Sequence, residues 1–209
     1  MNKIDVNGMS RIIKIMGEVI IEKEILFCEL DSKAGDGDFG MSIAKGFKVL
    51  LKKWEYLNRT DIGALLKDCG MIIMENCGGA SGPIWGTAFR SSGNFVKGKT
   101  IINLFEFAEM VQAGVDGIKK IGGAELGDKT LLDALIPTAL SLKKSSIEKK
   151  SFEEAFKIGA LAAVNGADKT KEYSAKKGRA SYLGERSLSY PDAGAMALGI
   201  IFTEIANKF

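Results

Sequence analysis

The chain has 209 residues, of which 46% are hydrophobic, 26% are charged and only 3 are proline. A chain of this length and balance can bury a substantial core, and the composition excludes collagen-like, low-complexity and disordered classes. The net charge is +3, and the two signs are interspersed without a long basic block, which argues against nucleic acid as the main partner. Charged residues interrupt every apolar stretch before it reaches the roughly 18 residues of a membrane span.

Neither the first residues nor the cysteines point to an oxidising compartment. Residues 1–10 lack a basic region followed by an uninterrupted apolar core, which a secretory signal requires. Cys28, Cys69 and Cys77 form no C-x-x-C pair and lie in apolar stretches, a pattern typical of reduced structural thiols. We therefore expect a cytoplasmic protein without a disulfide framework.

The sequence contains no histidine. Serine–histidine and cysteine–histidine nucleophiles, histidine-ligated zinc and histidine acid–base chemistry are therefore excluded. Any reaction must use carboxylates, lysine, arginine, backbone amides or a metal. This restriction favours phosphoryl transfer or metal-assisted chemistry over acyl transfer.

Apolar residues recur at helical spacing through most of the chain. In chain order, the expected helices cover 12–20 after a Ser10 cap, then about 41–54, 65–73, 82–95 and 103–120. Two more begin near Thr130 and Ser151, where Asp133 and Glu154 complete capping-box patterns, and the last spans about 192–206. With about eight helices and no convincing alternating strand, the sequence predicts an all-α single domain over residues 1–209.

Glycines gather in four connections between these helices, at 35–40, 78–86, 122–127 and 178–184. Glycine is costly within a helix, but it is needed where the backbone takes positive φ or approaches a ligand closely. Single glycines are also common at helix ends, which is the alternative explanation. We favour four loops that form one binding rim at the end of a helical bundle.

Three carboxylates, Asp31, Asp36 and Asp38, fall within eight residues around the first glycine-rich connection. They repel one another unless a cation is shared, and Mg²⁺ prefers a few carboxylates together with substrate phosphates. An EF-hand is excluded, because its fifth and twelfth positions counted from Asp36 would be Gly40 and Phe47. The alternative is a solvated polar turn.

Two nucleotide-binding sequence motifs occur without the preceding β-strand that each requires. Gly35, Gly37 and Gly40 match G-x-G-x-x-G, but no strand precedes them, and two aspartates in the loop would repel a pyrophosphate directly. Residues 93–100 match G-x-x-x-x-G-K-[ST], but a polar helix end precedes them where a P-loop needs a buried strand. We expect neither a dinucleotide fold nor a P-loop.

Two further segments have residues suited to phosphate. Residues 78–83 are small, with Pro83 fit for a first helical turn, so backbone N–H groups and the Ser81 hydroxyl can bind an anion. Farther on, Arg179 and Arg186 can fork onto phosphate oxygens, and Asp192 can cap the last helix. Solvated arginines are the alternative for that segment.

Together these segments resemble a known family, the ADP-binding L subunits of the dihydroxyacetone kinases that depend on the phosphoenolpyruvate phosphotransferase system. The resemblance is carried by G-D-G-D-F-G at 35–40, G-G-A-S-G-P at 78–83, G-D-K-T at 127–130 and G-R-A-S-Y-L-G-E-R-S at 178–187, followed by Asp192 and Gly194. It spans nearly the whole chain in the family's order. It implies an eight-helix antiparallel barrel with nucleotide-binding loops at one end.

The resemblance also implies the ligands. ADP or ATP would be a retained cofactor, held through two Mg²⁺ ions by Asp31, Asp36 and Asp38, with no covalent catalytic residue on this chain. The residues around the nucleotide would be Phe39, Gly40, Met41, Ser42, Ala80, Ser81, Gly122, Gly123, Leu131, Arg179, Asp192, Ala193 and Gly194.

By the same resemblance, the chain relays a phosphoryl group from a phosphocarrier M subunit, through the bound nucleotide, to dihydroxyacetone held by a K subunit. No nucleic acid or membrane partner is implied. One departure is Phe39, which stands where the family commonly has histidine. Two alternatives stay open: a non-catalytic regulatory or scaffold paralogue, of which Phe39 would be the sign, and an ATP-using kinase domain of the fatty-acid-kinase type.

Overall fold

The computed structural model describes residues 3–209, and α-helices make up most of them. They are α1 (Val6–Glu22), α2 (Glu24–Asp31), α3 (Phe39–Lys52), α4 (Ile62–Asn76), α5 (Ser81–Phe95), α6 (Leu104–Gly122), α7 (Leu132–Ile147), α8 (Phe152–Lys169) and α9 (Ala193–Lys208). The short 3-10 helices η1 (Trp54–Tyr56), η2 (Thr170–Glu172) and η3 (Arg179–Ser187) lie in connections. The prediction of an all-α fold is confirmed.

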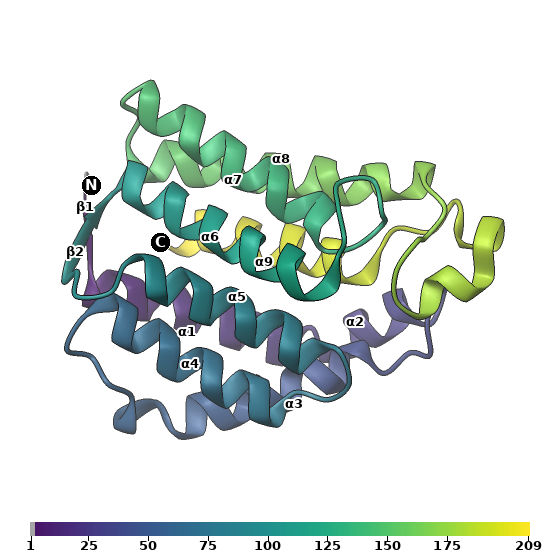
Figure 1. Ribbon diagram of the computed structural model, residues 1–209, viewed down its shortest axis with the longest axis horizontal. Coiled ribbons are helices and arrows are strands. Elements are labelled where there is room, and N and C mark those ends of the chain that lie inside the picture. The colour runs from purple at the N-terminus through teal and green to yellow at the C-terminus, as the bar shows by residue number, and fades with distance from the viewer. Residues whose placement is uncertain (1–2) are drawn as a thin grey trace.

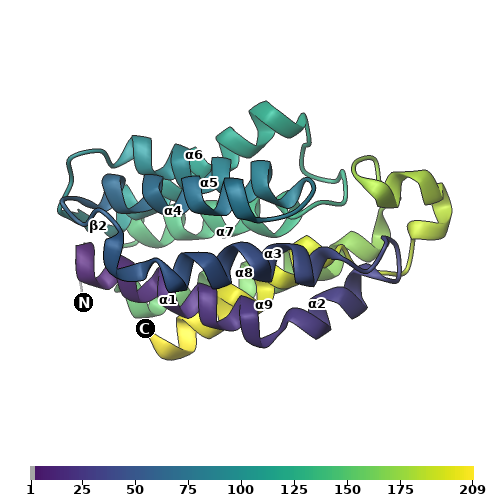
Figure 2. The same ribbon diagram turned by 90° about the horizontal axis from the view of Figure 1, so that it is seen from below.

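Eight of these helices close into a ring (Figure 1). Each helix from α3 to α9 packs against the next one in the chain, and α1 closes the ring by packing against both α3 and α9. Figure 2 shows the helices of the ring lying along a common axis, with neighbouring helices of the ring antiparallel. The short helix α2 lies outside the ring, mainly against α3, because the chain turns at Lys23. The eight-helix antiparallel barrel is therefore confirmed, with α2 as an addition.

Side-chain caps determine where several helices begin. Asp5, Asp61 and Asp192 each accept a hydrogen bond from the backbone N–H three residues later, at 2.7, 2.9 and 2.8 Å. The first helix therefore starts at Val6, and Ser10 lies within it. The prediction of a Ser10 cap was wrong because polar and flexible residues at 7–8 hide the first turn from an apolar pattern.

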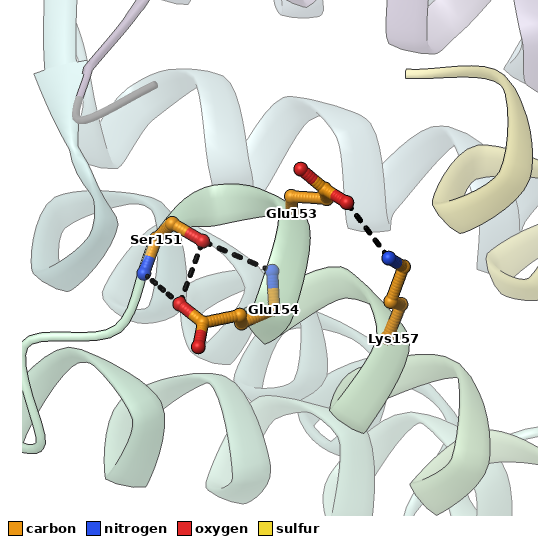
Figure 3. A network of polar contacts seen from close by, with 4 residues as sticks. All are labelled: Ser151, Glu153, Glu154 and Lys157. Atoms are coloured by element: carbon orange, nitrogen blue, oxygen red, sulfur yellow. Dashed lines mark hydrogen bonds and ion pairs between the residues drawn. The ribbon is translucent and has the colours of Figure 1, made fainter.

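Capping boxes begin two of the longer helices. Figure 3 shows Ser151 accepting from the Glu154 N–H at 3.2 Å while the Glu154 carboxylate accepts from the Ser151 N–H at 2.9 Å. Asn103 and Glu106 make the same exchange at the start of α6. Before α7 the pattern is partial, since Asp133 accepts from the Thr130 N–H at 2.8 Å but the helix begins at Leu132.

Two aromatic clusters fill the barrel core. Phe47 of α3 contacts Trp85 and Phe89 of α5 edge to face, with ring centroids 6.3 and 6.2 Å apart. A second cluster joins Phe107 of α6, Phe152 and Phe156 of α8, and the C-terminal Phe209. Buried aromatic side chains contribute large apolar areas, so these clusters hold the two sides of the ring together.

A two-stranded antiparallel ribbon closes one end of the barrel, beside the C-terminus (Figure 1). Its strands are β1 (Lys3–Asp5) and β2 (Ile101–Asn103), with Ile4 opposite Ile102 and both side chains buried. Three residues are too few to show an alternating pattern, which explains why no strand was expected. None of the described helices is both long and apolar enough to cross a bilayer.

The two misleading glycine patterns lie next to helices. Residues 35–40 follow α2, and residues 93–100 run from the end of α5 to β2. Neither segment follows a strand of a parallel sheet, and the ribbon formed by β1 and β2 is antiparallel. The expectation of neither a dinucleotide fold nor a P-loop is confirmed for the described residues.

Candidate functional site

The four glycine-rich connections meet at one end of the barrel, opposite the ribbon and the C-terminus (Figures 1 and 2). They surround a cleft of about 370 Å³. Its walls come from the α2–α3 loop, the start of α5, the α6–α7 loop and residues 177–194. Loops far apart in the sequence therefore share one site. This agrees with the prediction that the four glycine-rich loops form one rim at the end of the bundle.

Three aspartates gather at one side of this cleft. One carboxylate oxygen from each of Asp31, Asp36 and Asp38 lies within 4.8 Å of the other two. The Gly37 N–H donates to Asp31 at 2.9 Å, and the Arg179 guanidinium pairs with Asp36. Negative charges this close repel unless a cation is shared, and hard carboxylate oxygens are the ligands that Mg²⁺ prefers. The donor set fits such an ion.

Glycine is required for the turn that carries these aspartates. A Cβ on Gly35 would lie 2.3 Å from a carboxylate oxygen of Asp31, and one on Gly40 would lie 2.0 Å from the Glu24 carbonyl oxygen. Both contacts are far closer than real Cβ atoms approach, so no other residue fits without moving the loop. The aspartate spacing thus depends on close packing of the loop and α3 against α2.

The first turn of α5 also lines the cleft. Ser81 is the first residue of this helix, and no side chain caps it. The Ser42 hydroxyl of α3 donates to the Gly78 carbonyl at 2.8 Å, which ties the starts of α3 and α5 together. An uncapped helix N-terminus presents N–H groups that suit a phosphate. Carboxylates and anion donors therefore face one cavity.

A buried cation lies beneath the cleft. The Lys129 side chain is 2% exposed, and its ammonium donates to the carbonyl oxygens of Thr170, Tyr173 and Tyr190 at 2.6, 3.1 and 2.7 Å. Desolvation lowers the pKa of Lys129, and the nearby carboxylates of Asp133 and Asp192 oppose that shift. All three donors of the ammonium thus bind one segment of the chain.

Two carboxylates accompany this lysine. Asp133 is 2% exposed and accepts from the Gly127 and Thr130 N–H groups at 2.6 and 2.8 Å, which shapes the α6–α7 loop. Burial raises the pKa of Asp192 to about 7, against the opposing effects of the Ala195 N–H and of Lys129. The cleft floor therefore carries a carboxylate that gains its charge near neutral pH.

Residues 170–192 form an arm over the cleft. Lys177, Gly178 and Arg179 line the cavity, and Lys176 pairs with Asp128 of the α6–α7 loop at 3.0 Å. Positive φ values at Gly178 and Gly184 allow the sharp turns on either side of the arm's tip. The arm thus brings positive charge to the cleft, where Arg179 pairs with Asp36.

Most of the residues expected around a ligand do line this cavity. Those that line it are Asp31, Asp36, Asp38, Phe39, Ser42, Ala80, Ser81, Gly122, Leu131, Arg179, Asp192, Ala193 and Gly194. Gly40, Met41 and Gly123 do not: Gly40 is buried against Cys28, Met41 is exposed, and Gly123 ends α6 with φ of 58°.

Several other lining residues were not expected from the sequence to contact a ligand. They are Ile84, Trp85, Lys129, Thr130 and Lys177. Lys129 and Thr130 belong to the G-D-K-T segment noted from the sequence, and Trp85 lies three residues after the small-residue run of α5. From the sequence alone, a lysine in a glycine-rich loop is expected to be solvated. The carbonyls of Thr170, Tyr173 and Tyr190 reach Lys129 only in the folded chain.

Comparison with known proteins gives a consistent result. The family profile of the DAK2 domain matches residues 33–207. The chain is 35% identical over 190 residues to the PEP-dependent dihydroxyacetone kinase, ADP-binding subunit DhaL, of Escherichia coli (strain K12), with 91% of this chain and 90% of that protein covered. It is 38% identical over 199 residues to the ADP-binding subunit DhaL of kinase 2 of Listeria innocua, with 94% and 92% covered.

A solved structure has the same fold. The crystal structure of the dihydroxyacetone kinase from C. freundii in complex with AMP-PNP and Mg²⁺ is similar, with a TM-score of 0.77 and 25% sequence identity. The match covers 96% of this chain and 34% of that one. The present chain therefore spans about one third of that kinase and nearly all of the bacterial subunits.

Proposed function

We propose, since this chain belongs to the DAK2 domain family, that it is the ADP- and Mg²⁺-binding subunit of a dihydroxyacetone kinase assembled from several chains. The observation that carries this proposal is the set of three carboxylates within 4.8 Å of one another, in the same cleft as the uncapped start of α5. That arrangement suits a phosphate bound through a metal. Relatives named as ADP-binding subunits, similar along nearly their whole length, support it.

In this proposal one group of residues binds the metal and a second group binds the phosphates. Asp31, Asp36 and Asp38 hold Mg²⁺, as two ions in our proposal, and bound Mg²⁺ neutralises phosphate charge during phosphoryl transfer. The phosphates contact the start of α3 from Phe39 to Ser42 and the pair Ala80 and Ser81, where N–H groups of helix N-termini suit an anion. The remaining contacts to the nucleotide come from Gly122, Gly123, Leu131, Arg179, Asp192, Ala193 and Gly194.

The reaction is a relay in which the nucleotide stays bound. A phosphoryl group from a phosphocarrier M subunit would be transferred to the terminal phosphate of bound ADP and from there to a hydroxyl of dihydroxyacetone, which would regenerate ADP. This chain contains no histidine, and in the proposed relay a separate K subunit holds the triose. Here the chain positions the nucleotide and stabilises its charge, and supplies no covalent intermediate.

We also propose that the 209 residues act as one domain in the cytoplasm. The three cysteines are free thiols, and burial raises the pKa of Cys69 to about 12 and that of Cys77 to about 11. Thiols held protonated in this way suit a reducing compartment.

Phe39 favours a second candidate function, a regulatory or scaffold paralogue that binds a partner without transferring phosphate. Its ring lines the cleft and lies 6.1 Å from that of Phe27, so an apolar group occupies the first turn of α3 beside the aspartates. A transfer assay with purified K and M subunits separates the two functions. Turnover excludes the scaffold, and its absence together with intact ADP binding supports it.

Calorimetric titration of ADP into nucleotide-stripped protein tests the proposed site. Binding is expected with Mg²⁺ and not with EDTA. Asp36→Asn removes one charge from the cluster and is expected to weaken binding at least about tenfold. The matched control is Asp116→Asn, an exposed residue of α6 outside the cleft, which is expected to bind as the native chain does. Equal binding with and without Mg²⁺ would overturn the metal assignment.

A further inference from the structure

The ammonium group of Lys129 binds the two ends of one loop. Thr170 and Tyr173 lie where the chain leaves α8, and Tyr190 lies where it enters α9. Their carbonyl oxygens lie 2.6, 3.1 and 2.7 Å from the same nitrogen atom. A single side chain from the α6–α7 loop therefore closes the neck of the arm formed by residues 170–192.

Two further hydrogen bonds hold the neck of the arm closed. The Ser189 N–H donates to the Lys171 carbonyl at 3.0 Å, and the Asp192 N–H donates to the Thr170 hydroxyl at 2.8 Å. These bonds join the two chain segments of the neck, residues 170–173 and 189–192, to each other. The bonds of Lys129 differ from these two, because they join both segments of the neck to the loop between α6 and α7.

The residues beyond the neck reach the nucleotide cleft. Lys177, Gly178, Arg179 and Ala180 line the cavity, and Arg179 pairs with Asp36 on the far side. The arm also meets the α6–α7 loop at Lys176, whose backbone N–H donates to the Asp128 carbonyl at 3.1 Å and whose ammonium pairs with the Asp128 carboxylate at 3.0 Å. This contact and the three bonds of Lys129 at the neck together hold the arm relative to that loop.

Replacing the ammonium would leave three buried carbonyl oxygens without a hydrogen-bond donor. Lys129 is 2% exposed, so water cannot easily take over the three carbonyls, and buried acceptors without a donor are costly. The charge is also matched, because Asp133 and Asp192 lie close enough to favour it. The site thus requires a cation with several donors at one point.

We propose that Lys129 is a positioning residue that holds the arm of residues 170–192 over the cleft and thereby sets how slowly bound nucleotide leaves. The inference rests on the proposed nucleotide site. Lys129 acts on the nucleotide through the arm, so its loss opens the exit, while the α2–α3 loop that carries the three aspartates keeps its own backbone contacts. Release of nucleotide should therefore change far more than its association.

The test compares Lys129→Met with the native chain in two measurements. Hydrogen exchange of the nucleotide-free protein is expected to be at least about tenfold faster at residues 174–189 and unchanged in α4 and α5, because charged hydrogen bonds are lost only at the neck. Stopped-flow release of a fluorescent ADP analogue in Mg²⁺ is expected to accelerate at least about tenfold, with association within about twofold.

Lys171→Met is the matched control. It removes one charge from the same arm, but this side chain pairs with Asp168 at the surface, so both measurements are expected to match the native chain. Should Lys129→Met fail to fold, Lys129→Arg replaces it. Arginine keeps the charge but spreads its donors over a planar fork, so about threefold faster exchange and release are expected.

Native exchange at residues 174–189, or native release, in the Lys129 variant that folds would overturn the proposal. Uniformly faster exchange across all helices would overturn it as well, since that result indicates a general loss of stability. The exchange measurement needs no nucleotide, so it still tests the anchor if the native chain does not bind ADP. Failure of the anchor and failure of the proposed function are therefore distinguishable.

Discussion

Asp192 caps α9 and lines the cleft, so its charge affects both the helix and the ligand site. Its carboxylate accepts from the Ala195 N–H at 2.8 Å, which favours the ionised form. Burial and the nearby carboxylates of Asp133 and Asp31 disfavour that form more strongly, and its pKa rises to about 7. Lys129 reduces the shift but does not abolish it.

This raised pKa predicts a pH-dependent stability of the protein free of nucleotide and metal. Between the ordinary pKa of 3.8 and about 7, the folded protein holds a proton that the unfolded chain has released. Stability from this group is therefore fully present at low pH and is lost as pH rises through that window. Asp192→Asn keeps a capping side chain and removes the titration, so it is expected to be more stable than the native chain by about 2 kcal/mol at neutral pH.

Urea unfolding at about pH 5 and about pH 7.5, in EDTA, measures this difference. The gain from Asp192→Asn is expected at the higher pH and is expected to shrink at the lower one. A gain of equal size at both values would show that Asp192 does not titrate between them. Asp116→Asn is the control for the loss of one exposed aspartate charge.

At the scale of elements, the contact between α7 and α8 supports the cleft. A Cβ on Gly166 of α8 would lie 2.1 Å from the Asp133 carbonyl oxygen at the start of α7. The side chain of the same aspartate holds the Gly127 and Thr130 N–H groups. Close helix packing at Gly166 therefore fixes a residue that shapes the α6–α7 loop.

Two glycines of α8 should respond in opposite ways to alanine. Gly166→Ala forces α7 away and is expected to destabilise the protein by about 1–3 kcal/mol, as overpacking does. Gly159→Ala meets its nearest atoms at 3.4–3.7 Å, an ordinary contact, and is expected to be neutral or to gain up to about 1 kcal/mol from helix propensity. Chemical denaturation of the two variants measures both signs. A loss of similar size in both would show that α8 tolerates no Cβ along this face.

Across the whole molecule, helical spacing predicted most helices to within two residues. The expected ranges 82–95 and 103–120 correspond to Ser81–Phe95 and Leu104–Gly122. The range 65–73 was too short, because Gly63 interrupts the apolar pattern at the start of Ile62–Asn76 and the polar residues Glu75 and Asn76 lie at its end. Closure of the ring between α1 and α9 involves opposite ends of the chain, and local spacing carries no information about it. The family resemblance implied that closure.

The candidate site was predictable in part for a similar reason. Asp31, Asp36 and Asp38 are close in sequence, so a short turn suffices to bring their oxygens together. Lys129 meets carbonyls that lie 41, 44 and 61 residues away, and backbone carbonyls have no residue type that a pattern can reveal. Sequence reasoning thus found the metal-binding candidates and missed the cation that fixes the arm.

The cleft joins loops from around the whole ring, so a ligand bound there should stabilise the entire barrel. Mg²⁺ with ADP at about 100 times its dissociation constant adds about 2.7 kcal/mol to the free energy of unfolding. For a chain of this size, that gain corresponds to a rise of roughly 5–10 °C in Tm. Thermal unfolding with ADP in Mg²⁺ and in EDTA measures it, and little shift is expected in EDTA. Asp38→Asn is expected to lose the shift and Asp116→Asn to retain it; a full shift in Asp38→Asn would mean that nucleotide binding does not depend on the aspartate cluster.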